Sequence, residues 1–187
     1  MSQNGNYIKL PSLLSIEVEG YTLFKTAWSY QVEHGLNLFL GINELGKTTT
    51  ANMITYGLVG AYKDVNPKYF KSRAHMDGKT EPTVALSFKV GEDSLYIKRM
   101  LFSPAIVLFK VGKHEYTRES TPEIEKIYSN TLLELTGAIK ISDLSFLLRY
   151  LLSREEEGNF LLWNVKRQGN SPLREPRLFP TFPGSGG

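Results

Sequence analysis

The chain of 187 residues contains no cysteine, which excludes disulfide bonds and cysteine-ligated metal ions. No apolar run comes near the roughly 18 residues that a membrane-spanning helix requires. Residues 1–6 also lack the basic and apolar regions of a signal peptide. We therefore expect a cytoplasmic protein that does not contact a membrane. With 41% hydrophobic residues, the chain can bury the core of one domain.

An excess of charge of one sign is also missing from most of the chain. The net charge is +3, but Lys166, Arg167, Arg174 and Arg177 stand against Glu175 alone near the C-terminus. Without these five residues, the 22 basic and 19 acidic side chains become 18 and 18. The overall charge therefore gives no argument for nucleic-acid binding.

One stretch of the chain fits a motif with a known chemistry. Residues 41–48 read Gly-Ile-Asn-Glu-Leu-Gly-Lys-Thr, which fits the G-x-x-x-x-G-K-[ST] template of a phosphate-binding P-loop. An apolar run of strand length, 36–40, precedes the motif, and residues 49–58 after it are predicted to form a helix. Strand, glycine-rich loop and helix together are the context in which a P-loop binds nucleotide.

Each part of the template has a chemical role. The glycines let the backbone turn tightly, so that N–H groups and the helix N-terminus point at the phosphates. Lys47 is expected to reach the β- and γ-phosphates, and the Thr48 hydroxyl is expected to ligate Mg²⁺. We therefore predict ATP and Mg²⁺ as cofactors. The predicted nucleotide-binding residues are Gly41, Asn43, Glu44, Leu45, Gly46, Lys47, Thr48 and Thr49.

The other segments predict an antiparallel meander with flanking helices. Alternation and turn residues predict strands at 13–19, 26–33, 83–90, 94–101 and 105–111, with a short edge at 114–117. The polar segment 60–80 is predicted to be a surface loop, either simply solvated or facing nucleotide or DNA.

Two helices are predicted after the strands. The first opens with a capping box of Ser120 and Glu123 and ends at Gly137. The second is capped by Ser142 and Asp143, and its many apolar residues predict that it is largely buried.

The composition also divides the chain into three parts. We expect a flexible N-terminus at 1–12 and one lobe at 13–164, which ends with an apolar run at 160–163. Residues 165–187 are rich in proline, glycine and arginine and show no periodicity, so we expect a flexible tail that is cut short or partly an added linker.

The P-loop and its flanks resemble a known family. Gly20 and Tyr21 between two strands, the sequence Leu-Asn-Leu-Phe-Leu-Gly-x-Asn-x-x-Gly-Lys-Thr at 36–48, and Asn-Met-Ile at 52–54 are similar to the start of an SMC-type ATPase. This group comprises the structural-maintenance-of-chromosomes proteins and the SbcC, RecN and RecF families, all with ABC-like heads. The strands within 83–101 also resemble an SbcC-type head. The resemblance implies an α/β fold, here an α+β lobe: a P-loop NTPase half-domain of the ABC/SMC-head type.

Three positions depart from the family pattern. Glu44 replaces the usual glycine and brings a carboxylate beside the phosphate site, and Thr22 stands where SbcC-like heads often have arginine. The Q-loop glutamine, which in the family links the metal and the attacking water to the other lobe, has no clear counterpart. Gln168 is the candidate for this role, as a metal-linked residue in addition to Thr48.

Several motifs of the complete family head are missing from this sequence. No apolar run after Thr48 is followed directly by Asp-Glu, no Leu-Ser-Gly-Gly occurs, and no heptad pattern follows Trp163. The resemblance therefore implies the ATP-binding N-terminal lobe of a DNA-associated ATPase of repair, chromosome maintenance or anti-plasmid and anti-phage defence. Its implied partners are a C-terminal lobe of the same or a related polypeptide, a second head in a homodimer, and DNA. No complete catalytic set is expected in this chain alone.

Two other functions remain open at this point. One is a self-sufficient small P-loop NTPase or kinase, against which the two strands before the P-loop and the missing Asp-Glu pair argue. The other is a non-catalytic module that uses nucleotide only to regulate assembly. Turnover by the chain alone would favour the first, and nucleotide binding without turnover in any assembly would favour the second.

Overall fold

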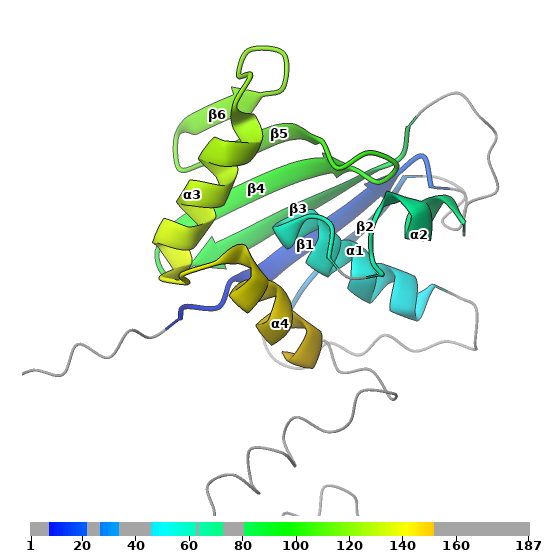
Figure 1. Ribbon diagram of the computed structural model, residues 1–187, viewed down its shortest axis with the longest axis horizontal. Helices are drawn as coiled ribbons and strands as arrows, with labels where there is room; N and C mark the ends of the chain where they lie inside the picture. The colour runs from blue at the N-terminus through cyan, green and yellow to red at the C-terminus, as the bar shows by residue number, and fades with distance from the viewer. Residues whose placement is uncertain (1–7, 22–26, 34–45, 63, 73–80, 152–187) are drawn as a thin grey trace, which may run out of the picture.

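The computed structural model describes residues 8–21, 27–33, 46–62, 64–72 and 81–151 (Figure 1). Its main element is a six-stranded antiparallel sheet with the order β2-β1-β3-β4-β5-β6. The strands are β1 (Ser12–Glu19), β2 (Trp28–Gln31), β3 (Thr83–Val90), β4 (Asp93–Met100), β5 (Ile106–Val111) and β6 (His114–Thr117). The helices of the described part are α1 (Lys47–Val59), α2 (Pro67–Lys71), α3 (Ile124–Thr136) and α4 (Ile141–Leu151).

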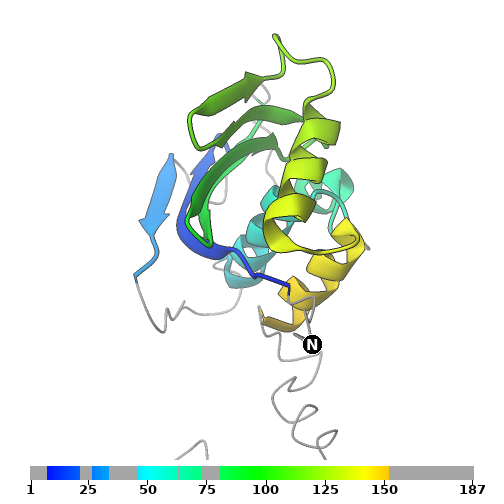
Figure 2. The same cartoon turned by 90° about the vertical axis from the view of Figure 1, so that its left-hand side faces the viewer.

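The protein forms two layers, a curved sheet and a layer of helices. Figure 2 shows the sheet from its edge, with the helices on its concave side. Residues on this side of neighbouring strands are paired in register and buried, as in the pairs Ile16–Leu86 and Leu86–Ile97. The sheet residues that form this apolar surface include Ile16, Val18, Val84, Leu86, Phe88, Leu95, Ile97, Ile106 and Phe109. Period-two alternation therefore places the core between sheet and helices.

The opposite face of the sheet is polar. Lys98 and Glu19 form an ion pair with 2.6 Å between the ammonium nitrogen and the carboxylate, and Lys110 and Glu115 form another at 2.6 Å. Such cross-strand pairs at a solvated surface contribute little to stability. These charged side chains suit a face in contact with water, while the apolar face of the sheet packs against the helices.

Helix α1 lies at the centre of the helical layer and contacts β3, β4 and α4. Its approach to the sheet is very close at Gly57, where an added Cβ would lie 2.4 Å from Leu86 Cδ1. Glycine at this position therefore allows the helix to touch the sheet without a side chain in between. The sequence predicts Ala51, Ile54 and Leu58 on one apolar face; Ile54 and Leu58 are buried, whereas Ala51 is half-buried. Burial extends all round the helix to residues such as Met53, Tyr56 and Gly57.

Most of the predicted elements are confirmed. The strands from residue 83 to residue 117 form the predicted antiparallel meander, and Gly91, with φ 63°, lies in the tight turn between β3 and β4. Gly137 ends α3 in the left-handed conformation, and its N–H donates to Leu133 O at 2.8 Å. The second predicted strand, 26–33, is shorter than expected, because β2 covers only Trp28–Gln31. The predicted strand at 36–40 lies outside the described residues.

The prediction of a surface loop over 60–80 is wrong in its first half. Residues 67–71 form helix α2, and Val65 and Phe70 are buried, with Phe70 at 0% exposure. The Asn66 side chain caps this helix by accepting from Lys68 N–H at 2.9 Å, and Pro67 occupies its first turn. This local start signal, combined with one aromatic anchor, is enough for a single helical turn against the core.

Both predicted N-caps are also wrong. Helix α3 begins at Ile124, with Glu123 at its N-cap, while the hydroxyl of Ser120 lies 2.7 Å from that of Thr117. Ser120 therefore closes the turn after β6 and does not cap the helix. Helix α4 begins at Ile141, so that Ser142 and Asp143 lie in its first turn.

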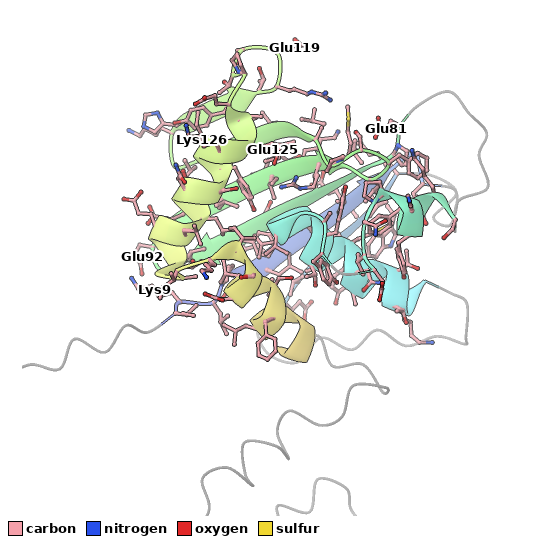
Figure 3. All side chains as sticks on the ribbon, viewed as in Figure 1. Lys9, Glu81, Glu92, Glu119, Glu125 and Lys126 are labelled. Atoms are coloured by element: carbon pink, nitrogen blue, oxygen red, sulfur yellow. The ribbon has the colours of Figure 1, made fainter. Side chains whose placement is uncertain are left out.

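Helix α4 is also less buried than its sequence predicts. Leu144 and Leu148 are buried, but Phe146 is 56% exposed. At the N-terminal side of the sheet, β1 agrees with the predicted strand 13–19 to within one residue. Strand β1 starts at Ser12, and Lys9 N–H donates to Thr136 O at 2.7 Å beside the end of α3 (Figure 3).

Candidate functional site

The predicted phosphate site is divided between described and undescribed residues. Gly46, Lys47, Thr48 and Thr49 form the N-cap and the first turn of α1. The other predicted site residues, Gly41, Asn43, Glu44, Leu45 and Gln168, lie outside the described residues, as does Thr22. The structure therefore bears on the helical end of the P-loop motif.

Gly46 has a backbone that requires glycine. Its φ of 84° and ψ of 8° are left-handed, a conformation that residues with a Cβ adopt only with strain. Gly46 O accepts the first helical hydrogen bond from Thr50 N–H at 2.7 Å, and the Thr50 hydroxyl donates to the same oxygen at 2.9 Å. The second fixed glycine of the motif thus sets the direction in which the chain enters α1.

The first turn of α1 has the polarity that an anion needs. The amides of Lys47, Thr48 and Thr49 precede the hydrogen-bond ladder of the helix, and they lie at the positive end of its dipole. The first turn contains no acidic residue. Thr48 is exposed and Lys47 is half-buried, whereas Thr49 is buried at 6% exposure. Lys47 and Thr48 can therefore both be reached from solvent.

The other end of α1 is held by a cluster that sequence reasoning missed. Arg99 of β4 is 3% exposed; its Nε donates to Gly57 O at 3.3 Å, and its Nη1 donates to Pro104 O at 3.1 Å. The same Nη1 lies 3.2 Å from the carboxylate of Glu125 at the start of α3 (Figure 3). Glu125 also accepts from Ile106 N–H at 2.7 Å. One guanidinium thus links α1, the turn after β4, and α3.

Two tyrosines complete this cluster. The Tyr128 hydroxyl donates to Leu58 O at 2.6 Å, and the Arg99 guanidinium carbon lies 5.7 Å from the centre of its ring. The Tyr56 hydroxyl donates to Met100 O at 3.2 Å and to Ser103 O at 3.1 Å. Burial raises the pKa of Tyr56 to about 12, and burial also raises the pKa of Tyr128 above its usual value, so both hydroxyls remain donors at neutral pH.

One signal in the sequence could have revealed Arg99. Strand β4 alternates Leu95, Ile97 and Arg99 on the face that the helices cover. A charged residue that follows apolar residues on the same face of a strand is either buried with them or lies at the end of the strand. A buried arginine needs several hydrogen-bond acceptors. The identity of those acceptors depends on contacts far apart in the chain, which the alternation does not give.

Searches with the sequence find no matching family model and no curated protein with significant similarity. In the part of the chain that the structure describes, no helix is long and apolar enough to cross a membrane. Among the same residues, no group of three or more histidine, aspartate and glutamate side chains could hold a metal ion.

The replacement Thr48→Val tests the predicted metal ligand. Valine keeps the shape of threonine and removes the hydroxyl, and the exposed position makes a change in stability small. We expect nucleotide affinity to fall roughly tenfold in the presence of Mg²⁺ and to change little in EDTA, as for the loss of one contact to a charged group. Affinities measured in both buffers check this. An equal loss in both would assign the hydroxyl to the phosphate or to the fold instead.

Proposed function

We propose that this chain is the ATP-binding N-terminal lobe of an SMC-like ATPase. The observation that carries the proposal is the position of Gly46, Lys47 and Thr48 within a P-loop motif. The glycine is left-handed, and the lysine and threonine lie in the accessible first turn of a helix whose body is buried against the sheet. This arrangement suits phosphate binding, because a fixed helix terminus offers its amides and a lysine to an anion.

In this function, the residues of the chain bind and orient the nucleotide. Lys47 contacts the β- and γ-phosphates, the amides of the first turn bind phosphate oxygens, and the Thr48 hydroxyl faces Mg²⁺. Magnesium would neutralise phosphate charge at this site. Glu44 lies within the same motif of the sequence. Its carboxylate would weaken ATP binding by repelling the phosphates.

Hydrolysis in this proposal requires a second lobe and a second head. A γ-phosphate must be contacted from both sides, and the attacking water must be positioned by a carboxylate. The sequence has no Asp-Glu pair after an apolar run and no Leu-Ser-Gly-Gly. We propose that engagement of two heads around ATP supplies these groups and rearranges the DNA-contacting surfaces of the assembly, in repair, chromosome maintenance or defence.

Sheet geometry favours this proposal over a self-sufficient kinase or GTPase. In those enzymes the P-loop usually follows the first strand of a parallel sheet, whereas here β1 and β2 precede α1 and the described sheet is antiparallel throughout. A module that binds nucleotide without turnover in any assembly is the remaining alternative.

Steady-state phosphate release by the purified chain tests whether ATP hydrolysis requires a second lobe. We expect no turnover above that of the Lys47→Ala variant, which serves as a control for contaminating ATPases. Turnover near the ~1 s⁻¹ or faster of complete enzymes, lost in the variant, would contradict the half-site and favour the self-sufficient enzyme. Turnover that appears only after a C-terminal lobe is added would support the proposal and exclude the non-catalytic module.

A further inference from the structure

The two ends of α1 have different environments. Its N-terminal turn carries the accessible Lys47 and Thr48, whereas the carbonyls at its C-terminal end are bonded to buried donors. Gly60 N–H donates to Tyr56 O at 2.8 Å, Arg99 Nε donates to Gly57 O at 3.3 Å, and Tyr128 OH donates to Leu58 O at 2.6 Å. Three consecutive carbonyls are therefore fixed by groups from the helix end, from β4 and from α3.

The guanidinium of Arg99 is also fixed from the other side. Glu125 and Pro104 O accept from it, and Glu125 is itself held by Ile106 N–H. A lysine could not make this set of contacts, because its single ammonium group lacks the planar fork of donors. Two buried tyrosines near this guanidinium, Tyr56 and Tyr128, are neutral at physiological pH.

A helix of this length transmits displacement from one end to the other. The 13 residues of α1 span about 20 Å at 1.5 Å per residue. Its packing against Leu86 leaves no room for a side chain at Gly57, and a close-packed contact of this kind transmits strain instead of absorbing it. If the hydrogen bonds to the carbonyls of Gly57 and Leu58 are lost, α1 can shift or rotate at this end. Such a movement of α1 would also displace the amides of its first turn.

We propose that Arg99 is a positioning residue for the nucleotide site, acting through α1 with the help of Tyr128. This inference rests on the proposed function, because it concerns the same phosphate site. The cation also lies at the negative end of the helix dipole, while phosphate binds at the positive end. Loss of Arg99 therefore removes both the geometric anchor of α1 and a charge that stabilises it.

The experiment compares three variants of the complete chain. Arg99→Lys keeps the positive charge but loses the planar set of guanidinium donors. Tyr128→Phe removes only the hydroxyl that donates to Leu58 O. Thr136→Val is the matched control, since it also removes a buried hydroxyl that donates to a helix carbonyl, Leu132 O at 2.7 Å, but in α3. Mg·ATP affinity is measured by calorimetry at a temperature at which each variant is folded, and exchange of the Thr50 amide, which donates to Gly46 O at 2.7 Å, is followed without nucleotide.

We expect Kd to rise about tenfold in Arg99→Lys, as for a small displacement of an aligned site. In Tyr128→Phe we expect a rise of about threefold, as for one lost hydrogen bond. Exchange of the Thr50 amide should accelerate in both variants, whereas Thr136→Val should match the wild type in affinity and in exchange at this amide.

Each other result counts against the inference in a distinct way. Wild-type affinity in Arg99→Lys and Tyr128→Phe would overturn the positioning role and leave the proposed function standing. An equal loss in Thr136→Val would reduce the effect to general destabilisation. If the wild type itself does not bind Mg·ATP, the proposed function fails and the positioning role fails with it. If Arg99→Lys does not fold, the affinity and amide exchange of Tyr128→Phe, compared with those of Thr136→Val, test the positioning role.

Discussion

Replacing Lys47 with alanine is expected to remove detectable ATP binding while leaving the unfolding temperature of the free protein nearly unchanged. Lys47 is the first residue of α1 and is half-buried, outside the apolar core, and alanine is a good helix former. A charge-assisted contact to phosphate is roughly twice as strong as a neutral hydrogen bond. Its loss from a site that binds ATP weakly should bring the affinity below the measurable range.

The measurement is the rise in unfolding temperature that ATP and Mg²⁺ produce. A ligand that binds only the folded state raises the free energy of unfolding by RT ln(1 + L/Kd), where L is the concentration of free ligand. We expect a rise for the wild type and none for Lys47→Ala. The matched control is Lys126→Ala, which removes an exposed lysine of α3 whose ammonium lies 3.6 Å from Glu123. If the wild type and Lys47→Ala show the same rise, Lys47 is not in the site.

Replacing Phe70 with alanine is expected to lower the free energy of unfolding by about 3–5 kcal/mol, the usual range for a fully buried phenylalanine. Phe70 is 0% exposed, and its ring centre lies 4.9 Å from that of Tyr56 in α1. Its carbonyl also accepts from Tyr21 OH at 3.0 Å. The truncation therefore opens a cavity between α2 and α1, and denaturant unfolding measures the loss of stability.

A neighbouring residue provides the control for this effect. Lys68→Ala changes an exposed side chain of the same short helix and should alter the free energy of unfolding by less than about 0.5 kcal/mol. A loss below about 1 kcal/mol for Phe70→Ala would mean that this segment behaves as the surface loop that its sequence indicates.

The strands could be predicted because their signal is local. Alternation with a period of two, together with Gly91 in a turn that needs a left-handed backbone, defines the strands from 83 to 117 to within a few residues. Gly137, which is also left-handed, defines the end of α3. Helix α1 could also be predicted from a local pattern. The position of β1 between β2 and β3 could not, because the pairing joins residues about 70 positions apart in sequence, as in Ile16 with Leu86.

The elements that were missed depend on single contacts. Segment 60–80 is polar, and among its described residues Val65 and Phe70 are buried in the core. In α3, the capping box failed because Ser120 found a nearer partner in Thr117. Arg99 looks in the sequence like a strand end, and its role depends on Gly57, Pro104 and Glu125, which come together only in the folded chain.

The sequence covers more of the candidate site than the structure describes. The sequence predicts the whole motif from Gly41 to Thr48, and the structure describes its last three residues with the helix that follows. The left-handed Gly46 agrees with the template, since the motif places glycine there. The anchoring of α1 by Arg99 could not be predicted from the motif, because it lies at the opposite end of the helix.

Titration calorimetry of Mg·ATP into the purified chain tests the central claim most directly. The account predicts saturable, weak binding of one ATP per chain, because the phosphate-binding groups of one lobe are present without those of a second. The absence of saturable binding at millimolar ATP, from a preparation that unfolds cooperatively on heating, would contradict it.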